Sequence, residues 1–206
     1  MKLKLKICGM RDHDNILAVA AYGPAYMGFI FYEKSPRFVG KDFVMPGMAE
    51  QISRVGVFVN AAIDDVMNKV KAHSLAFVQL HGDETPEICS AIKEAGAGVI
   101  RAFSVDEHFD FAVTQDYERV ADFFLFDTKA QLYGGTGKRF DWRLLDRYKG
   151  ALPFFLSGGI SAEHLKEVSE LSHKNLYAVD VNSGVELAPG VKDMEKIKLV
   201  NTYFNN

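Results

Sequence analysis

Several side chains able to act as acid, base or nucleophile stand at the ends of short apolar runs in this 206-residue sequence. Cys8, His81 and Asp127 each follow such a run, and Asp180 lies near the end of another. A carboxylate that follows four large apolar residues, as Asp127 does, needs a partner or a ligand, so it is a candidate site residue; capping the next loop is its alternative role. Cys8 is either a reactive thiol or an inert small hydrophobe.

Eight β-rich runs alternate with helical segments along the chain, which predicts a repeat of one strand and one helix. Helix starts are visible at Thr85-Pro86-Glu87 and at Ser161, ahead of 162–171. Eight units of roughly 26 residues suit short strands, short helices and short loops. The expected strands are Leu3–Cys8, Tyr26–Phe31, Arg54–Val59, Ala76–Leu80, Val99–Phe103, Phe123–Asp127, Phe154–Ser157 and Tyr177–Val181.

This pattern predicts an α/β fold, a minimal (β/α)8 TIM barrel with a closed parallel sheet, as a single domain over residues 1–206. A doubly wound open sheet is the alternative. That fold would favour a GxGxxG motif after the first strand, where this chain has Cys8-Gly9-Met10-Arg11 instead.

Composition excludes several classes of partner. The chain carries 24 basic and 27 acidic residues, a net charge of −3, so we expect no nucleic acid and no membrane as partner. The two cysteines have no CxxC spacing, which indicates reduced thiols and a cytoplasmic protein. No apolar run is long enough to span a bilayer. No second His or acid lies at metal-ligand spacing, so we expect no metal.

In a (β/α)8 barrel the active site forms at the carboxyl ends of the strands. We therefore expect Cys8, His81, Asp127 and Asp180 to share one site. His81 either touches substrate or is a satisfied hydrogen-bonding residue. Arg37 follows the second strand in Ser35-Pro36-Arg37 and could bind a carboxylate or phosphate through two hydrogen bonds, or lie idle on the surface.

Two glycine-bearing loops follow the last two strands and contain no Lys or Arg. They are Ser157-Gly158-Gly159-Ile160-Ser161 and Asn182-Ser183-Gly184. Backbone N–H groups of such loops bind phosphate in many barrels, although glycines after a strand also serve as simple tight turns. The segment from Tyr133 to Lys138 fails the Walker A pattern and is interpreted as a lid over substrate or as an ordinary surface loop.

Taken together, these motifs resemble the phosphoribosylanthranilate isomerase family of tryptophan biosynthesis, over nearly the whole chain. The motifs that carry the resemblance are Lys6-Ile7-Cys8-Gly9, Ser35-Pro36-Arg37, Val55-Gly56-Val57-Phe58-Val59-Asn60, Val78-Gln79-Leu80-His81-Gly82-Asp83-Glu84, Phe126-Asp127-Thr128, Gly134-Gly135-Thr136-Gly137, Phe140-Asp141-Trp142, Leu156-Ser157-Gly158-Gly159 and residues 181–193.

The resemblance implies an Amadori rearrangement of N-(5-phosphoribosyl)anthranilate, a small phosphosugar, with no cofactor. It implies Cys8 as general base and Asp127 as general acid, and Arg37 as the group that binds the anthranilate carboxylate. From their positions at strand ends, we also expect His81 and Asp180 to contact the substrate. The phosphate would bind at Gly158, Gly159, Asn182, Ser183 and Gly184. The chain departs from the family at Met10-Arg11 and at Asn182, where a small polar residue and Ser are common.

That chemistry sets requirements on the two catalytic groups. An acid must protonate the ring oxygen and a base must remove the C2 proton, so the two must flank the sugar. Asp127 would need a raised pKa and Cys8 a lowered one. Lys6 shares the inward face of its strand with Cys8, and either favours the thiolate or simply pairs with an acid in the barrel.

Three alternatives remain at this point. Indoleglycerol-phosphate synthase would want catalytic lysines and a longer N-terminus, and the histidine-pathway aminoaldose isomerase would want an Asp where Cys8 stands. A catalytically silent phosphosugar-binding barrel has no reason to hold both Cys8 and Asp127, and turnover of substrate separates it from an enzyme. The sequence is compatible with a monomer or a homodimer.

Overall fold

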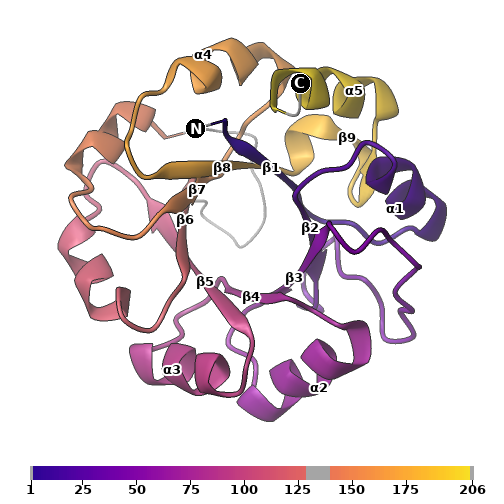
Figure 1. Ribbon diagram of the computed structural model, residues 1–206, viewed down its shortest axis with the longest axis horizontal. Helices are drawn as coiled ribbons and strands as arrows, with labels where there is room; N and C mark the ends of the chain where they lie inside the picture. Colours follow the sequence, from indigo (N-terminus) through magenta and orange to yellow (C-terminus); the bar gives the residue numbers. More distant parts are fainter. Residues whose placement is uncertain (1, 129–139, 205–206) are drawn as a thin grey trace.

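The computed structural model describes residues 2–128 and 140–204, and eight parallel strands in it close into a barrel in chain order (Figure 1). The predicted (β/α)8 barrel is therefore confirmed, and each predicted strand is present with its ends within two residues. The strands are β1 Lys4–Ile7, β2 Tyr26–Ile30, β3 Ser53–Phe58, β4 Phe77–Leu80, β5 Gly98–Val105, β6 Phe123–Thr128, β7 Phe154–Leu156 and β8 Leu176–Val181.

Helices surround the barrel, but the predicted repeat of one helix per strand is wrong in part. Between β2 and β3, residues 31–52 form turns and one isolated bridge, because Pro36, Gly40 and Pro46-Gly47 interrupt any helix. The segment after β5, and residues 140–153 before β7, contain 3-10 helices in place of α-helices. The helices are α1 His13–Ala20, α2 Ile63–His73, α3 Pro86–Glu94, α4 Leu165–Glu170 and α5 Met194–Phe204, with 3-10 helices η1 Phe111–Tyr117, η2 Trp142–Arg147, η3 Ala162–His164 and η4 Ser183–Val185.

A short antiparallel hairpin follows β8 and contributes side chains to the mouth of the barrel. It is formed by β9 (Glu186–Ala188) and β10 (Val191–Lys192). The side chain of Asn15 in α1 holds it through the backbone of Lys192, since Asn15 Nδ2 donates to the carbonyl of Lys192 and Asn15 Oδ1 accepts from the N–H of Lys192. The hairpin is thereby tied to the first helix of the fold.

The lower interior of the barrel is filled by an aromatic floor. Four rings from the even-numbered strands meet edge to face or stacked, with centroids 4.9 to 6.4 Å apart. A fifth ring, from β7, packs against three of them. This arrangement fills the barrel interior near the amino ends of the strands, which leaves the carboxyl ends for polar side chains. The rings of the aromatic floor are Tyr26, Phe77, Phe123, Tyr177 and Phe155.

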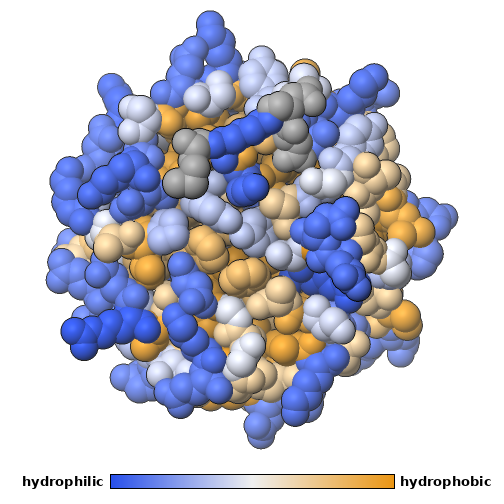
Figure 2. Space-filling model, in the orientation of Figure 1, coloured by the Kyte–Doolittle hydropathy of each residue, from blue (hydrophilic) through white to orange (hydrophobic). Residues whose placement is uncertain are grey.

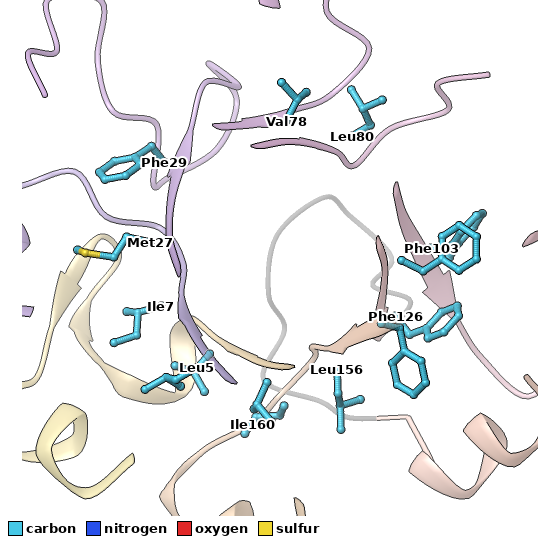
Figure 3. Packing of buried hydrophobic residues seen from close by; sticks show 14 of the residues in the cluster. Leu5, Ile7, Met27, Phe29, Val78, Leu80, Phe103, Phe126, Leu156 and Ile160 are labelled. Atoms are coloured by element: carbon cyan, nitrogen blue, oxygen red, sulfur yellow. The ribbon is translucent and has the colours of Figure 1, made fainter. Parts of the chain in front are cut away.

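Alternate residues of the same strands point outward and form the larger core with the helices. Leu5 and Ile7 of β1 and Met27 of β2 are fully buried and point away from the barrel axis (Figure 3). On the face shown in Figure 2, hydrophilic residues occupy the periphery and apolar residues show between them nearer the centre. No helix within residues 2–128 and 140–204 has the length and apolarity that crossing a bilayer requires.

Phe155 tests the aromatic floor. It is fully buried against Tyr26, Phe123 and Tyr177, so Phe155→Ala should lower the free energy of unfolding by about 3–5 kcal/mol. Urea denaturation measures this, with Val44→Ala, at a 78% exposed position, as the matched control. A loss below about 1 kcal/mol for Phe155→Ala, typical of surface changes, would show that the floor is dispensable.

Candidate active site

The polar side chains singled out in the sequence gather at the carboxyl end of the barrel. Cys8 directly follows β1, His81 directly follows β4, and Asp127 and Asp180 lie in the last residues of β6 and β8. Cys8 and Asp180 are buried, whereas the side chains of His81 and Asp127 are about one quarter exposed. The closed sheet thus brings together four groups that are up to 172 positions apart in the chain.

Lys6 points into the barrel, as strand alternation predicts, and forms a buried ion pair with Asp180. Its Nζ lies 2.9 Å from Asp180 Oδ1, and the two side chains are 0% and 5% exposed. Burial disfavours the charge on Lys6, but Asp180 and Cys8 more than offset it, so the pKa of Lys6 is raised. Burial raises the pKa of Asp180, and Lys6 opposes that rise. The structural role considered for Lys6 is therefore present.

The thiol of Cys8 differs from the expectation of a lowered pKa. Burial raises the pKa of Cys8, with Lys6 and Lys192 acting in the opposite direction and Asp180 adding to the rise. The physical reason is that the thiol is almost completely removed from water while the charge of Lys6 is balanced by its partner Asp180. Lys6 does favour the thiolate, as predicted, but its effect is smaller than that of burial.

Asp127 is held by the next residue of β6 and faces His81. Its Oδ1 accepts a hydrogen bond of 2.8 Å from the N–H of Thr128, and its Oδ2 lies 3.5 Å from His81 Nε2. His81 Nδ1 in turn is 2.8 Å from Nε2 of the buried Gln79, which fixes the plane of the imidazole. With the amide in this orientation, Gln79 donates and the imidazole Nε2 carries the proton toward Asp127.

The two predicted phosphate loops lie against each other and against the acid. Gly158 and Gly159 have φ of +95° and +66°, a left-handed backbone that favours glycine. A Cβ on Gly158 would come within 2.9 Å of Asp127 Oδ1, and a Cβ on Gly184 would collide with the carbonyl of Ile160. Gly158 and Gly184 are therefore needed for the close packing of these loops.

Arg37 is buried and already engaged. Its Nε and Nη2 donate three hydrogen bonds of 2.7 to 3.1 Å to the carboxylate of Glu186, at the start of β9. Glu186 also accepts from Lys192, whose Nζ lies 2.8 Å from Oε1. Burial raises the pKa of Glu186, but Arg37 and Lys192 outweigh it, so the carboxyl has a lowered pKa. Lys192 donates as well to Asn182 Oδ1 and to the Asn182 carbonyl, at 2.9 and 3.3 Å.

Gln79, Glu186 and Lys192 are residues of this end of the barrel that sequence reasoning did not single out. A glutamine two positions before His81 was a usable signal, because alternate residues of a strand share a face. Glu186 and Lys192 carried no such signal. They stand in a hairpin after the last strand, and only the folded chain shows that their side chains turn back to Arg37 and Asn182.

Other predicted features take less part in the site. Cys89 is buried in α3, and burial raises its pKa to about 11, which disfavours a reactive thiolate at this position. Met10, a departure from the family pattern, is fully buried in the outer core. The glycine-rich segment from Tyr133 to Lys138 lies outside the described residues. Within the described ranges, no group of three His, Cys, Asp or Glu residues is placed to hold a metal ion.

Comparison with known proteins adds independent findings. Residues 5–202 match a protein family described as N-(5'-phosphoribosyl)anthranilate (PRA) isomerase. The N-(5'-phosphoribosyl)anthranilate isomerase of Parabacteroides distasonis is 46% identical over 94% of this chain and 90% of its own. The solved phosphoribosyl anthranilate isomerase of Thermotoga maritima superposes with a TM-score of 0.84 at 33% identity, covering 98% of each chain. A similar structure, at 30% identity, 98% coverage of each chain and TM-score 0.79, holds reduced 1-(o-carboxyphenylamino)-1-deoxyribulose 5-phosphate.

Because Lys6 and Asp180 act on the pKa of Cys8 in opposite directions, removing each charge should shift that pKa in opposite directions. In a Cys89→Ala background, Cys8 should titrate above the ordinary thiol pKa. Lys6→Met should raise that pKa further, and Asp180→Asn should lower it, because Lys6 favours and Asp180 disfavours the thiolate. The rate of iodoacetamide alkylation against pH measures the titration. Lys4→Met, an exposed lysine of the same strand, is the control; an unshifted titration in folded Lys6→Met would remove Lys6 from this role.

Proposed function

The chain belongs to the N-(5'-phosphoribosyl)anthranilate isomerase family and is an isomerase of tryptophan biosynthesis, and we propose that Cys8 and Asp127 are the base and the acid of its reaction. The observation that carries this assignment is their placement: both stand at the carboxyl end of the barrel, on strands β1 and β6, which lie across the mouth from each other. An acid and a base that must act on two parts of one sugar need such a separation.

The reaction moves two hydrogens within the substrate. Protonation of the ring oxygen by Asp127 opens the ribose, and the nitrogen lone pair forms a C=N bond at C1. The thiolate of Cys8 then takes the proton from C2, the C–H electron pair forms the C1–C2 double bond, and the C=N electrons return to nitrogen. The resulting enol gains a proton at C1 and loses one from its oxygen, which leaves the ketone at C2.

The surroundings of each group support its role. Asp127 is a quarter exposed, so a ring oxygen of the substrate can reach it. Its carboxyl group is fixed by the N–H of Thr128 and has the imidazole of His81 beside it. Cys8 is enclosed, and burial raises the pKa of its thiol; the ammonium of Lys6 opposes that rise and favours the thiolate that the role of base requires. His81 and Asp180 lie at the same end of the barrel, and we propose them as substrate contacts.

The two anionic ends of the substrate would bind to different groups at the mouth. We propose that Gly158, Gly159, Asn182, Ser183 and Gly184 hold the phosphate, because the loops that contain them touch at Gly184 and offer backbone N–H groups. Arg37 would hold the anthranilate carboxylate. Its Nη1 has no hydrogen-bond partner among the residues that the structure describes, so one edge of the guanidinium remains for a ligand.

Turnover is the direct test of the whole proposal. Addition of the purified protein should remove the fluorescence of phosphoribosylanthranilate without any added metal or cofactor. A barrel that binds the phosphosugar but leaves the fluorescence unchanged would be a silent member of the family, and the base and acid assignments would fail with it.

We also propose where the enzyme acts and how many subunits it has. Two free cysteines, both buried, suit the reducing cytoplasm, and the net charge of −3 gives no reason to expect a nucleic acid partner. We propose a single-domain enzyme that works as a monomer or a homodimer, which light scattering of the purified protein distinguishes.

Loss of either catalytic group should abolish most of the turnover while the fold survives. Cys8→Ala and Asp127→Asn should each lower kcat by about 10² to 10⁴-fold, the usual contribution of a positioned base or acid. Steady-state kinetics measure this, with Cys89→Ala as the matched cysteine control that keeps wild-type kcat. A variant that stays within about tenfold of wild type would lose its assigned role.

The contact between the two phosphate loops gives a further prediction. Gly184→Ala should raise the inhibition constant of inorganic phosphate and the KM of substrate by roughly tenfold, because the added Cβ collides with the carbonyl of Ile160 and moves the loop. The control is Gly47→Ala, where the new methyl group meets open space. Unchanged phosphate inhibition in Gly184→Ala would place the phosphate elsewhere.

A further inference from the structure

Three charged side chains meet in a buried cluster beside the mouth, which we name the Arg37 cluster: Arg37, Glu186 and Lys192. Their side chains are 8%, 5% and 0% exposed. Two cations therefore face one carboxylate, at 2.7 Å and 2.8 Å, and the cluster carries a surplus of one positive charge away from water.

Hydrogen bonding shows which form of Lys192 the cluster holds. Its Nζ has three acceptors within 3.3 Å, namely Glu186 Oε1, Asn182 Oδ1 and the Asn182 carbonyl. An ammonium group has three N–H donors, whereas a neutral amine has two, so three acceptors match the charged form. Burial lowers the pKa of Lys192 and the carboxylate of Glu186 opposes that effect.

We propose that Lys192 is a positioning residue for the substrate carboxylate: by sharing Glu186 with Arg37, it leaves Arg37 with net positive charge and holds it against Asn182 of the phosphate loop. This inference rests on the proposed function, since it assumes that Arg37 meets the anthranilate carboxylate. It adds a residue that never touches substrate but decides whether Arg37 attracts an anion.

The charge balance explains why the cluster needs its second cation. Arg37 and Glu186 alone would form a neutral pair, and a second carboxylate arriving at Arg37 would meet no net charge. With Lys192 present, an incoming carboxylate brings the cluster to two cations and two anions. Inside a protein such a balance matters more than in water, because the effective dielectric constant is lower.

The same contacts fix the geometry of the site. Glu186 binds Arg37 through Nε and Nη2, so the guanidinium plane is held and its Nη1 edge is the one that faces away from Glu186. Lys192 binds both the side chain and the backbone of Asn182, which adopts an unusual φ of −139° and ψ of −95°. One lysine thus joins the carboxylate side and the phosphate side of the proposed site.

The remaining charges nearby are balanced or point elsewhere. Lys6 and Asp180 form a neutral pair, and burial keeps Cys8 toward its neutral form. Lys196 touches Glu186 only through its backbone carbonyl, at 3.1 Å, and is 43% exposed. Lys196 is therefore a matched control: a nearby lysine that contacts the same residue without entering the buried cluster.

Two ligands separate the carboxylate from the rest of the molecule. The first is reduced 1-(o-carboxyphenylamino)-1-deoxyribulose 5-phosphate, and the second is the same compound with phenyl in place of carboxyphenyl. The ratio of their dissociation constants, measured by calorimetry, reports the carboxylate alone. Wild-type protein should bind the first more tightly, and Arg37→Met should remove most of that preference.

Lys192→Met should reduce the preference by roughly tenfold, equal to about 1.4 kcal/mol, while Lys196→Met leaves it unchanged. Lys192→Gln keeps N–H donors for Asn182 and Glu186 and is the second neutral variant, expected to lose the preference to the same extent. Adding Lys192→Met to Arg37→Met should cause no further loss, because both act on one interaction.

The alternative outcomes separate the two hypotheses. If folded Lys192→Met or Lys192→Gln weakens both ligands equally, Lys192 only supports the fold of the loop and the inference is overturned. If wild-type protein shows no preference, or Arg37→Met retains it, the assignment of Arg37 in the proposed function fails instead.

Discussion

The ion pair between Lys6 and Asp180 is the interaction on which the site depends. It joins β1 to β8, the seam where the barrel closes, and the two residues are register partners across that seam. A slip of one residue would turn each side chain to the outside of the barrel. Breaking a buried pair by removing one partner costs about 3–5 kcal/mol, because the other charge is left uncompensated. The same ion pair therefore stabilises the closure of the sheet and holds two charged side chains inside the barrel.

The aromatic floor explains why the charged groups lie where they do. Rings such as Phe155 and Phe123 fill the lower interior, so water and polar side chains have access only from the carboxyl end. Lys6 points into the same interior and is removed from water, so its charge can be satisfied only by groups inside the barrel. The same enclosure acts on Cys8. Burial raises the pKa of its thiol, and the nearby cations then oppose that rise instead of acting alone.

The sequence predicted the barrel well because the strands are separated by clear helix starts and turn residues. Thr85-Pro86 begins α3 as expected, and alternation along β1 placed Lys6 and Cys8 on one face. The connections were predicted less well. Residues 31–52 keep enough apolar side chains to suggest a helix, and only the prolines and glycines among them argue against it.

The site residues differ in the same way: those at strand ends could be predicted from the sequence, and those in other segments could not. Cys8, His81 and Asp127 could be found because a barrel brings all strand ends together, whatever lies between them. The partner of Arg37 could not, because Glu186 is 149 positions away and belongs to a hairpin that the repeat pattern does not contain. Periodicity places backbones, whereas the pairing of charges depends on which long side chains meet in the folded chain. The pKa of Cys8 shows the same limit: strand alternation placed the cation of Lys6 beside the thiol, but the burial that raises the pKa of Cys8 above its ordinary value depends on how the whole barrel interior packs.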